Sequence, residues 1–345
     1  MRYTISLALA TLTALPAMAD VPRVVADFAP VQGLVATVMG DLGQPDLLLD
    51  RGANAHSFQL RPSQAAGLAD ADLVIWVGPE MSPWLDRTLE GLGNVAQLRL
   101  LGIPGTHLQD FGATGAHDHA EDDHAEQDHE GHDHEGHDHA AEAAGHDDHD
   151  HEAHDHDAHD HETHDHDDHA GHAHTGTDPH AWLDPANGAI WLEAIAAELG
   201  KLDPENAATY TANAAAGKTA IAALDASLAT QLAPVQGKPF VVFHDAYGYF
   251  SAHYGLTVAG SVALGDATAP GAAHLKELTE KAGTALCLFP EAGHDPKLVA
   301  QMAETAGVKL GTPLDPEGAA VEPGAGAYLA TLQGLADVLT GCLAE

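Results

Sequence analysis

Basic residues are scarce in this chain of 345 residues, which has 13 Lys and Arg against 52 Asp and Glu. The formal net charge is −39, and 22 of the acidic residues lie in one segment, 117–174, that has no Lys or Arg at all. An acidic surface of this size repels nucleic acid and suits a protein that binds cations. We therefore expect no nucleic-acid partner.

Long apolar runs are also missing. No stretch after the first 19 residues has 18 uninterrupted apolar residues, so no membrane span is predicted. The chain opens with Met1-Arg2, an apolar stretch over 5–15 and then Ala17-Met18-Ala19, which is typical of a cleavable signal peptide over 1–19. No Cys follows it, which disfavours a lipid anchor. We expect an exported protein of a Gram-negative periplasm.

Cysteine is limited to Cys287 and Cys342. In an oxidising compartment such a pair favours a disulfide over a metal site. Cys287 lies in a short apolar run, and Cys342 lies in the last expected helix. The sequence therefore predicts a Cys287–Cys342 disulfide.

Histidine, in contrast, is abundant. Segment 117–174 has 20 of the 27 His, mostly in His-Asp-His repeats, and almost no apolar side chain larger than Ala. It cannot form a hydrophobic core, so we expect a disordered loop. Imidazole binds zinc and other late first-row divalent ions well. The expected weak secondary metal ligands in this tract are His132, His134, His137, His139, His154, His156, His164 and His166.

Short apolar runs alternate with helical patterns on both sides of the tract, which is typical of parallel α/β sheets covered by helices. We expect two α/β lobes, each a mainly parallel sheet flanked by helices, over 20–204 and 233–345. The tract is inserted in the first lobe. Expected strands are 23–28, 46–49, 72–77, 95–101, 240–243, 256–262, 285–289 and 308–310. Expected helices are 31–39, 62–69, 83–92, 185–200, 245–254, 271–282, 295–306 and 325–343.

One long helix over 205–232 is expected to join the lobes rigidly. This segment is rich in Ala and has no Pro. Asp203 is the expected N-cap, and Pro204 suits the first helical position. At 1.5 Å per residue, the helix would be about 42 Å long.

Three histidines outside the tract stand in distinctive places. His56 follows an expected strand, His180 precedes an expected helix, and His244 closes another strand. Ligands of parallel α/β sheets bind at the carboxyl ends of the strands, so the three could face one cleft. No short metal-binding motif contains them, and only the fold could bring them together. Taken singly, each is better interpreted as an ordinary partly buried or capping His. His107, His253, His274 and His294 are interpreted as structural.

At these residues the chain resembles a known family, the periplasmic zinc-binding receptors of high-affinity zinc-uptake ABC transporters. This resemblance covers essentially the whole mature chain, and the tract lies just ahead of His180 as in the family. The matching stretches are 52–64, 76–80, 178–185, 243–250, 286–291 and 314–316.

The resemblance implies that His56, His180 and His244 bind one Zn²⁺ between the lobes. Zinc members of the family often have Glu before the first His, where this chain has Ala55. The fourth ligand could therefore be Asp315, in the Leu-Asp-Pro motif, or a water, or a His of the tract. Asp315 could instead simply cap the turn at Pro316.

The sequence thus predicts a monomeric zinc receptor, not an enzyme. It would deliver Zn²⁺ to the membrane permease of an ABC importer, and a periplasmic zinc chaperone is a possible further partner. The alternative is a zinc storage or chaperone protein that acts mainly through the tract. A zinc hydrolase would also use three His, but it would need a general base beside the metal.

Overall fold

Two four-stranded parallel sheets organise the part of the chain that the computed structural model describes, residues 21–112, 176–263 and 270–344. The predicted α/β fold with two sheets and one long helix is confirmed. The expected signal peptide and the tract 117–174, including the eight His proposed as weak ligands, lie outside the described residues.

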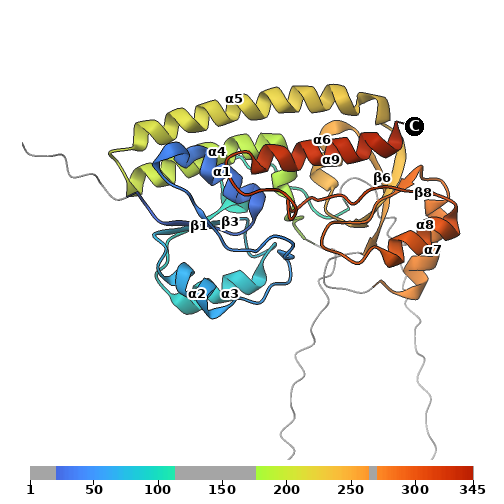
Figure 1. Ribbon diagram of the computed structural model, residues 1–345, viewed down its shortest axis with the longest axis horizontal. Helices are drawn as coiled ribbons and strands as arrows, with labels where there is room; N and C mark the ends of the chain where they lie inside the picture. Colours follow the sequence, from blue (N-terminus) through green and yellow to red (C-terminus); the bar gives the residue numbers. More distant parts are fainter. Residues whose placement is uncertain (1–20, 113–175, 264–269, 345) are drawn as a thin grey trace, which may run out of the picture. The chain divides into compact units, whose positions relative to one another are not determined.

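The first sheet has the strand order β2-β1-β3-β4, with every neighbouring pair parallel. Figure 1 shows α1 on one face of this sheet and α2 and α3 on the other. The sheet therefore sits between helices, as its apolar strands require. Its elements are β1 (Val24–Ala26), α1 (Ala29–Met39), β2 (Asp46–Leu47), α2 (Pro62–Ala69), β3 (Leu73–Trp76), α3 (Pro83–Leu92) and β4 (Gln97–Arg99).

The second sheet has the order β6-β5-β7-β8 and is again parallel throughout. Helices α7 and α8 pack against its strands. All eight expected strands form, although several are shorter than expected. The elements are β5 (Pro239–His244), α6 (Gly248–Tyr254), β6 (Thr257–Ala263), α7 (Ala272–Ala282), β7 (Cys287–Leu288), α8 (Lys297–Ala306), β8 (Lys309–Leu310) and α9 (Ala327–Leu343).

Two consecutive helices follow the tract, α4 (Pro185–Leu202) and the long α5 (Ala207–Leu232). Helix α5 begins two residues later than expected, and its N-cap is Asn206 rather than Asp203. The reason is local. The Asp203 carboxylate accepts hydrogen bonds from the Asn206 amide and the Tyr210 hydroxyl, so it closes the turn between the two helices. Pro204 lies in that turn.

Successive side chains of β5 point to opposite faces of the second sheet and so belong to two different cores. Phe240 and Val242 join the large core that also contains the first sheet, α4, α5 and α9. Val241, between them, faces a smaller core with side chains of α7 and α8. This is the period of two expected for a strand covered on both faces. One continuous apolar core therefore connects the two sheets.

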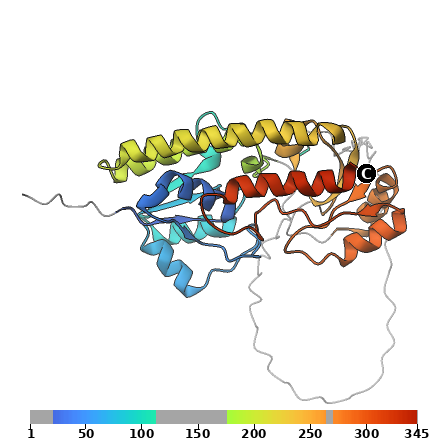
Figure 2. The same ribbon diagram turned by 45° about the horizontal axis from the view of Figure 1, so that its top comes forward.

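Helix α9 belongs to the expected second lobe, yet it packs against α1 and α5. Figures 1 and 2 both show α9 running beside α5. The division of the chain into lobes at 205–232 stays a prediction. The other end of α9 is held covalently, because the Cys287–Cys342 disulfide ties it to β7 as predicted. Closing a loop with a sequence separation of 55 contributes about 4 kcal/mol in the chain-entropy account.

By their contacts the described residues all belong to one compact unit. Among the described helices, none is both long and apolar enough to cross a bilayer.

Candidate metal centre

Three imidazoles from distant parts of the sequence meet in the structure. The Nε2 atom of His180 lies 3.2 Å from that of His56 and 3.3 Å from that of His244. One ligand atom from each of the three lies within 4.8 Å of the other two. Around a tetrahedral zinc with bonds of about 2.0–2.1 Å, neighbouring ligand atoms are about 3.3 Å apart. The spacing of these nitrogens is therefore that of a metal site.

Each histidine is placed by a different element. His244 is the last residue of β5, in the middle of its sheet. His180 precedes the short 3-10 turn Ala181–Leu183 that leads into α4. His56 lies in the loop between β2 and α2, where the hydroxyl of Ser82 and the indole of Trp84 both donate to the Ala55 carbonyl. His180 before a helical turn and His244 at a strand end are thus placed as predicted, whereas His56 lies nine residues beyond the end of β2 at Leu47.

Two of the rings are oriented from behind by buried carboxylates. Asp178 Oδ1 lies 2.6 Å from Nδ1 of His180, and Glu291 Oε2 lies 2.6 Å from Nδ1 of His244. An ionised carboxylate can only accept a hydrogen bond there, so in the neutral ring Nδ1 is the donor and Nε2 carries a lone pair. The two Nε2 atoms then face each other as acceptors, and a cation between them would satisfy both. The sequence reasoning did not assign these roles to Asp178 and Glu291, although both lie in the stretches that carry the resemblance.

His56 differs from the other two because a carboxylate lies on the Nε2 side of its ring. Glu317 Oε1 lies 3.8 Å from His56 Nε2, while Glu317 Oε2 accepts a hydrogen bond of 3.1 Å from the Ala55 amide. Side-chain exposure is 18% for His56 and 9% for Glu317. Sequence reasoning missed Glu317. Its only signal was its place just beyond the Leu-Asp-Pro motif.

Asp315, expected as a fourth ligand, is not brought into the histidine group. Its two carboxylate oxygens accept hydrogen bonds of 2.8 Å from the Ala319 and Ala320 amides. The carboxylate therefore closes the turn that follows Pro316, which is the capping role weighed as the alternative. Of the four expected ligands, the structure assembles the three histidines.

Comparison with known proteins identifies the family. Residues 24–342 match the family described as zinc-uptake complex component A, periplasmic (ZnuA). This chain belongs to the ZnuA family. It is 54% identical over 333 residues to the high-affinity zinc uptake system protein ZnuA of Paracoccus denitrificans, covering 96% of this chain and 94% of the relative. The ZnuA protein of Brucella suis biovar 1 is 38% identical, with 93% and 92% covered.

A solved structure supports the fold. A crystal structure of ZnuA superimposes with a TM-score of 0.65 and 21% identity, over 93% of this chain and all of that one. At that identity the likeness concerns the fold alone.

The remaining histidines of this ZnuA-family chain that the structure describes all have other partners. His107 Nδ1 lies 2.9 Å from Asp184, and His253 Nε2 lies 2.8 Å from Asp225. His274 Nε2 lies 2.9 Å from the Ser261 carbonyl. His294 packs against Phe243, with ring centroids 4.4 Å apart and planes tilted by 39°, and its Nε2 lies 3.7 Å from Glu291 Oε1. These contacts agree with their interpretation as structural residues.

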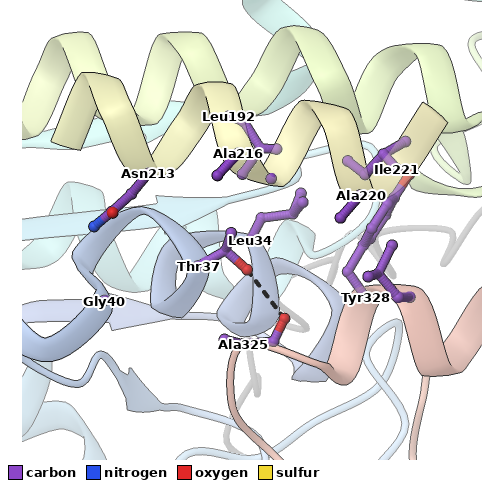
Figure 3. A pocket seen from close by; sticks show the side chains of 12 residues that line it. Leu34, Thr37, Gly40, Leu192, Asn213, Ala216, Ala220, Ile221, Ala325 and Tyr328 are labelled. Carbon is purple, nitrogen blue, oxygen red and sulfur yellow. Dashed lines mark hydrogen bonds between the residues drawn. The ribbon is translucent and has the colours of Figure 1, made fainter. Parts of the chain in front are cut away.

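A cavity of about 310 Å³, whose lining includes none of the three histidines, lies between α1, α5 and α9 (Figure 3). Its walls are mostly apolar and include Leu34, Ile221 and Tyr328, and Thr37 at its edge donates to the Ala325 carbonyl. Its lining has no His, Cys, Asp or Glu that could bind a metal. Among the described residues, the group that could hold a metal ion is that of the three imidazoles.

Proposed function

We propose that this chain is a periplasmic zinc receptor that holds Zn²⁺ with His56, His180 and His244. It would deliver the ion to the membrane permease of an ABC importer. The family, whose description names zinc uptake and the periplasm, supports this proposal. The observation that carries it is the meeting of three Nε2 atoms, two of them held as acceptors by buried carboxylates.

The donor set favours zinc. Imidazole nitrogen suits zinc and its late first-row neighbours, whereas carboxylate, carbonyl and water oxygen suit magnesium, calcium and manganese. Two of the rings are also held by the protein itself, since His180 and His244 are each only 1% exposed and hydrogen-bonded to buried carboxylates. Little ordering is then needed on binding, which favours tight capture. Nanomolar affinity would correspond to about −12 kcal/mol.

Capture and delivery require no covalent chemistry. The Asp178 and Glu291 carboxylates behind the rings offset part of the charge of a divalent ion, and they keep both Nε2 lone pairs aimed at it. A periplasmic location also agrees with the Cys287–Cys342 disulfide, because such bonds persist in oxidising compartments. A zinc chaperone as donor and a monomeric state remain predictions.

Calorimetric zinc titration of the full chain and of a variant lacking 118–173 tests this function. The base of that segment is suited to splicing, since Asp110 and Thr177 pair as an antiparallel bridge on its two sides. We expect one tight site in both proteins, and several weaker sites in the full chain alone. The composition of the tract predicts disorder, and ligands that must be ordered on binding hold a metal more weakly.

Two outcomes would contradict the proposal. If the shortened protein lost tight binding, the storage alternative, with the tract as the functional part, would be favoured. If His180→Ala in the shortened protein left tight binding unchanged, the site would lie elsewhere.

A further inference from the structure

Three neutral imidazoles leave a zinc ion with an open coordination position and its full charge of +2. In this chain the residue before His56 is Ala55, which offers no side-chain ligand. Asp315 is engaged in its own turn through both carboxylate oxygens. A carboxylate from another part of the chain is therefore the group to look for.

Glu317 has the negative charge that such a ligand needs, and it lies close to the three histidines. Its Oε1 approaches His56 on Nε2, the atom that faces the other two rings, at 3.8 Å. This is about half an ångström more than the spacing of about 3.3 Å between neighbouring ligands of a tetrahedral zinc. Glu317 lies outside the set of atoms that are all within 4.8 Å of one another, so its carboxylate has to turn toward His180 and His244 on binding. The Ala55 amide donates to Oε2, and Oε1 is the oxygen that lies 3.8 Å from His56 Nε2.

The backbone around Glu317 is anchored to the same elements that carry the histidines. The Trp182 indole, two residues after His180, donates to the Pro316 carbonyl at 2.8 Å. Leu314 pairs with Glu291, whose carboxylate orients His244. Glu317 is thus presented to the site by contacts with the segments of His180 and His244.

The turn itself is built to present this residue. Gly318, directly after Glu317, adopts a φ of +66°, a conformation that side-chain-bearing residues rarely take. The Asp315 carboxylate closes the turn around it through Ala319 and Ala320. Asp315 therefore acts as a positioning residue for its neighbour.

We propose that Glu317 is the anionic fourth ligand of the zinc site. This inference rests on the proposed function and identifies the group that completes the three-histidine set. One carboxylate would fill the open position and cancel half of the metal charge. Glu317 lies in the segment after β8, far in sequence from His56. Its carboxylate would take the place of the Glu that zinc members of the family often have where this chain has Ala55.

The test compares Glu317→Gln with Glu322→Gln in the full-length protein. Glu322 lies in the same segment, and its side chain is 82% exposed and paired with Arg51, so it provides a matched control. Zinc affinity is measured by chelator competition below one equivalent of metal, where the tight site fills first. We expect Glu317→Gln to weaken that site at least tenfold, Glu317→Asp to recover part of the loss, and Glu322→Gln to match the wild type.

A second readout separates a ligand from a neighbour. Cobalt(II) placed in the tight site reports its coordination through its visible absorption bands, which should change in Glu317→Gln and not in Glu322→Gln. Wild-type affinity in Glu317→Gln would overturn the proposal, and so would weaker affinity with an unchanged cobalt spectrum. His180→Ala keeps these results distinct from a failure of the proposed function, because that variant must lose the tight site if the three-histidine assignment is right.

Discussion

The imidazoles of His180 and His244 are each oriented by one carboxylate oxygen that contacts Nδ1, the nitrogen on the side away from the metal site. Glu291 Oε2 is 2.6 Å from His244 Nδ1 and also accepts a hydrogen bond from the Tyr247 hydroxyl. An amide in place of this carboxylate would lower the basicity of the ring and could present an N–H to Nδ1, which favours the wrong tautomer. The residue behind the ligand thus matters for metal affinity as well as for packing.

At this scale we predict that Glu291→Gln weakens zinc binding by 10- to 100-fold, as is typical for partners of metal-bound histidines. Chelator competition on the purified variant measures the change. Glu304→Gln, an exposed substitution on α8, is the control and should bind zinc like the wild type. Unchanged affinity in Glu291→Gln would mean that the carboxylate does not orient His244.

Glu317 also shows where sequence reasoning ends at the level of single residues. His56, His180 and His244 could be selected because each stands next to an expected strand or helix end. Glu317 lies just outside the stretches that carry the resemblance, and the Ala55 amide that it contacts is 262 positions away. Asp315 had the motif, but only the hydrogen bonds of its turn show that its oxygens are engaged.

Among the secondary-structure elements, hydrophobic periodicity predicted every strand and the course of the long helix, because burial on one or both faces dictates which residues are apolar. Boundaries were less certain. The start of α5 depends on which groups donate hydrogen bonds to the Asp203 carboxylate. The local sequence pattern does not distinguish an Asp that caps a helix from one that closes a turn between two helices. The packing of α9 against α1 likewise depends on contacts between distant segments.

The ends of β1 and β3 are joined by a fully buried carboxylate. Asp27 accepts hydrogen bonds from the amides of Phe28 and Val77, directly after the two strands. Burial raises the pKa of Asp27 to about 7, although the backbone hydrogen bonds act in the opposite direction. The folded protein therefore holds a proton at Asp27 at a pH where the unfolded chain has released it.

This raised pKa predicts that the free energy of unfolding of the metal-free protein contains a contribution that falls as pH rises from about 4 to about 7. The folded state binds more protons in that window, so raising the pH favours the unfolded state. Each pKa unit corresponds to about 1.4 kcal/mol, which makes the contribution several kcal/mol. Asp27→Asn removes it. Urea unfolding at a series of pH values gives the free energy of unfolding at each pH. Plotted against pH between about 4 and about 7, this free energy should have a less negative slope for Asp27→Asn than for the wild type. An identical slope in both proteins would contradict the raised pKa.

For the molecule as a whole, one continuous core holds together the segments around the site. Side chains of both sheets, α4, α5 and α9 belong to one buried cluster, so the segments that carry the three histidines are supported by a common framework. Sequence patterns predicted the two sheets and the helix between them. They could not predict that the same core would extend through all of these elements, because that depends on how the faces meet.

The central claim is that His56, His180 and His244 together hold one zinc ion. Crystals of the zinc-loaded protein lacking 118–173, measured with X-rays on both sides of the zinc absorption edge, test it most directly. We predict a single strong anomalous peak about 2.0–2.1 Å from the Nε2 atoms of all three histidines. A peak at any other group of side chains, or no peak near these three nitrogens in zinc-loaded crystals, would contradict the claim.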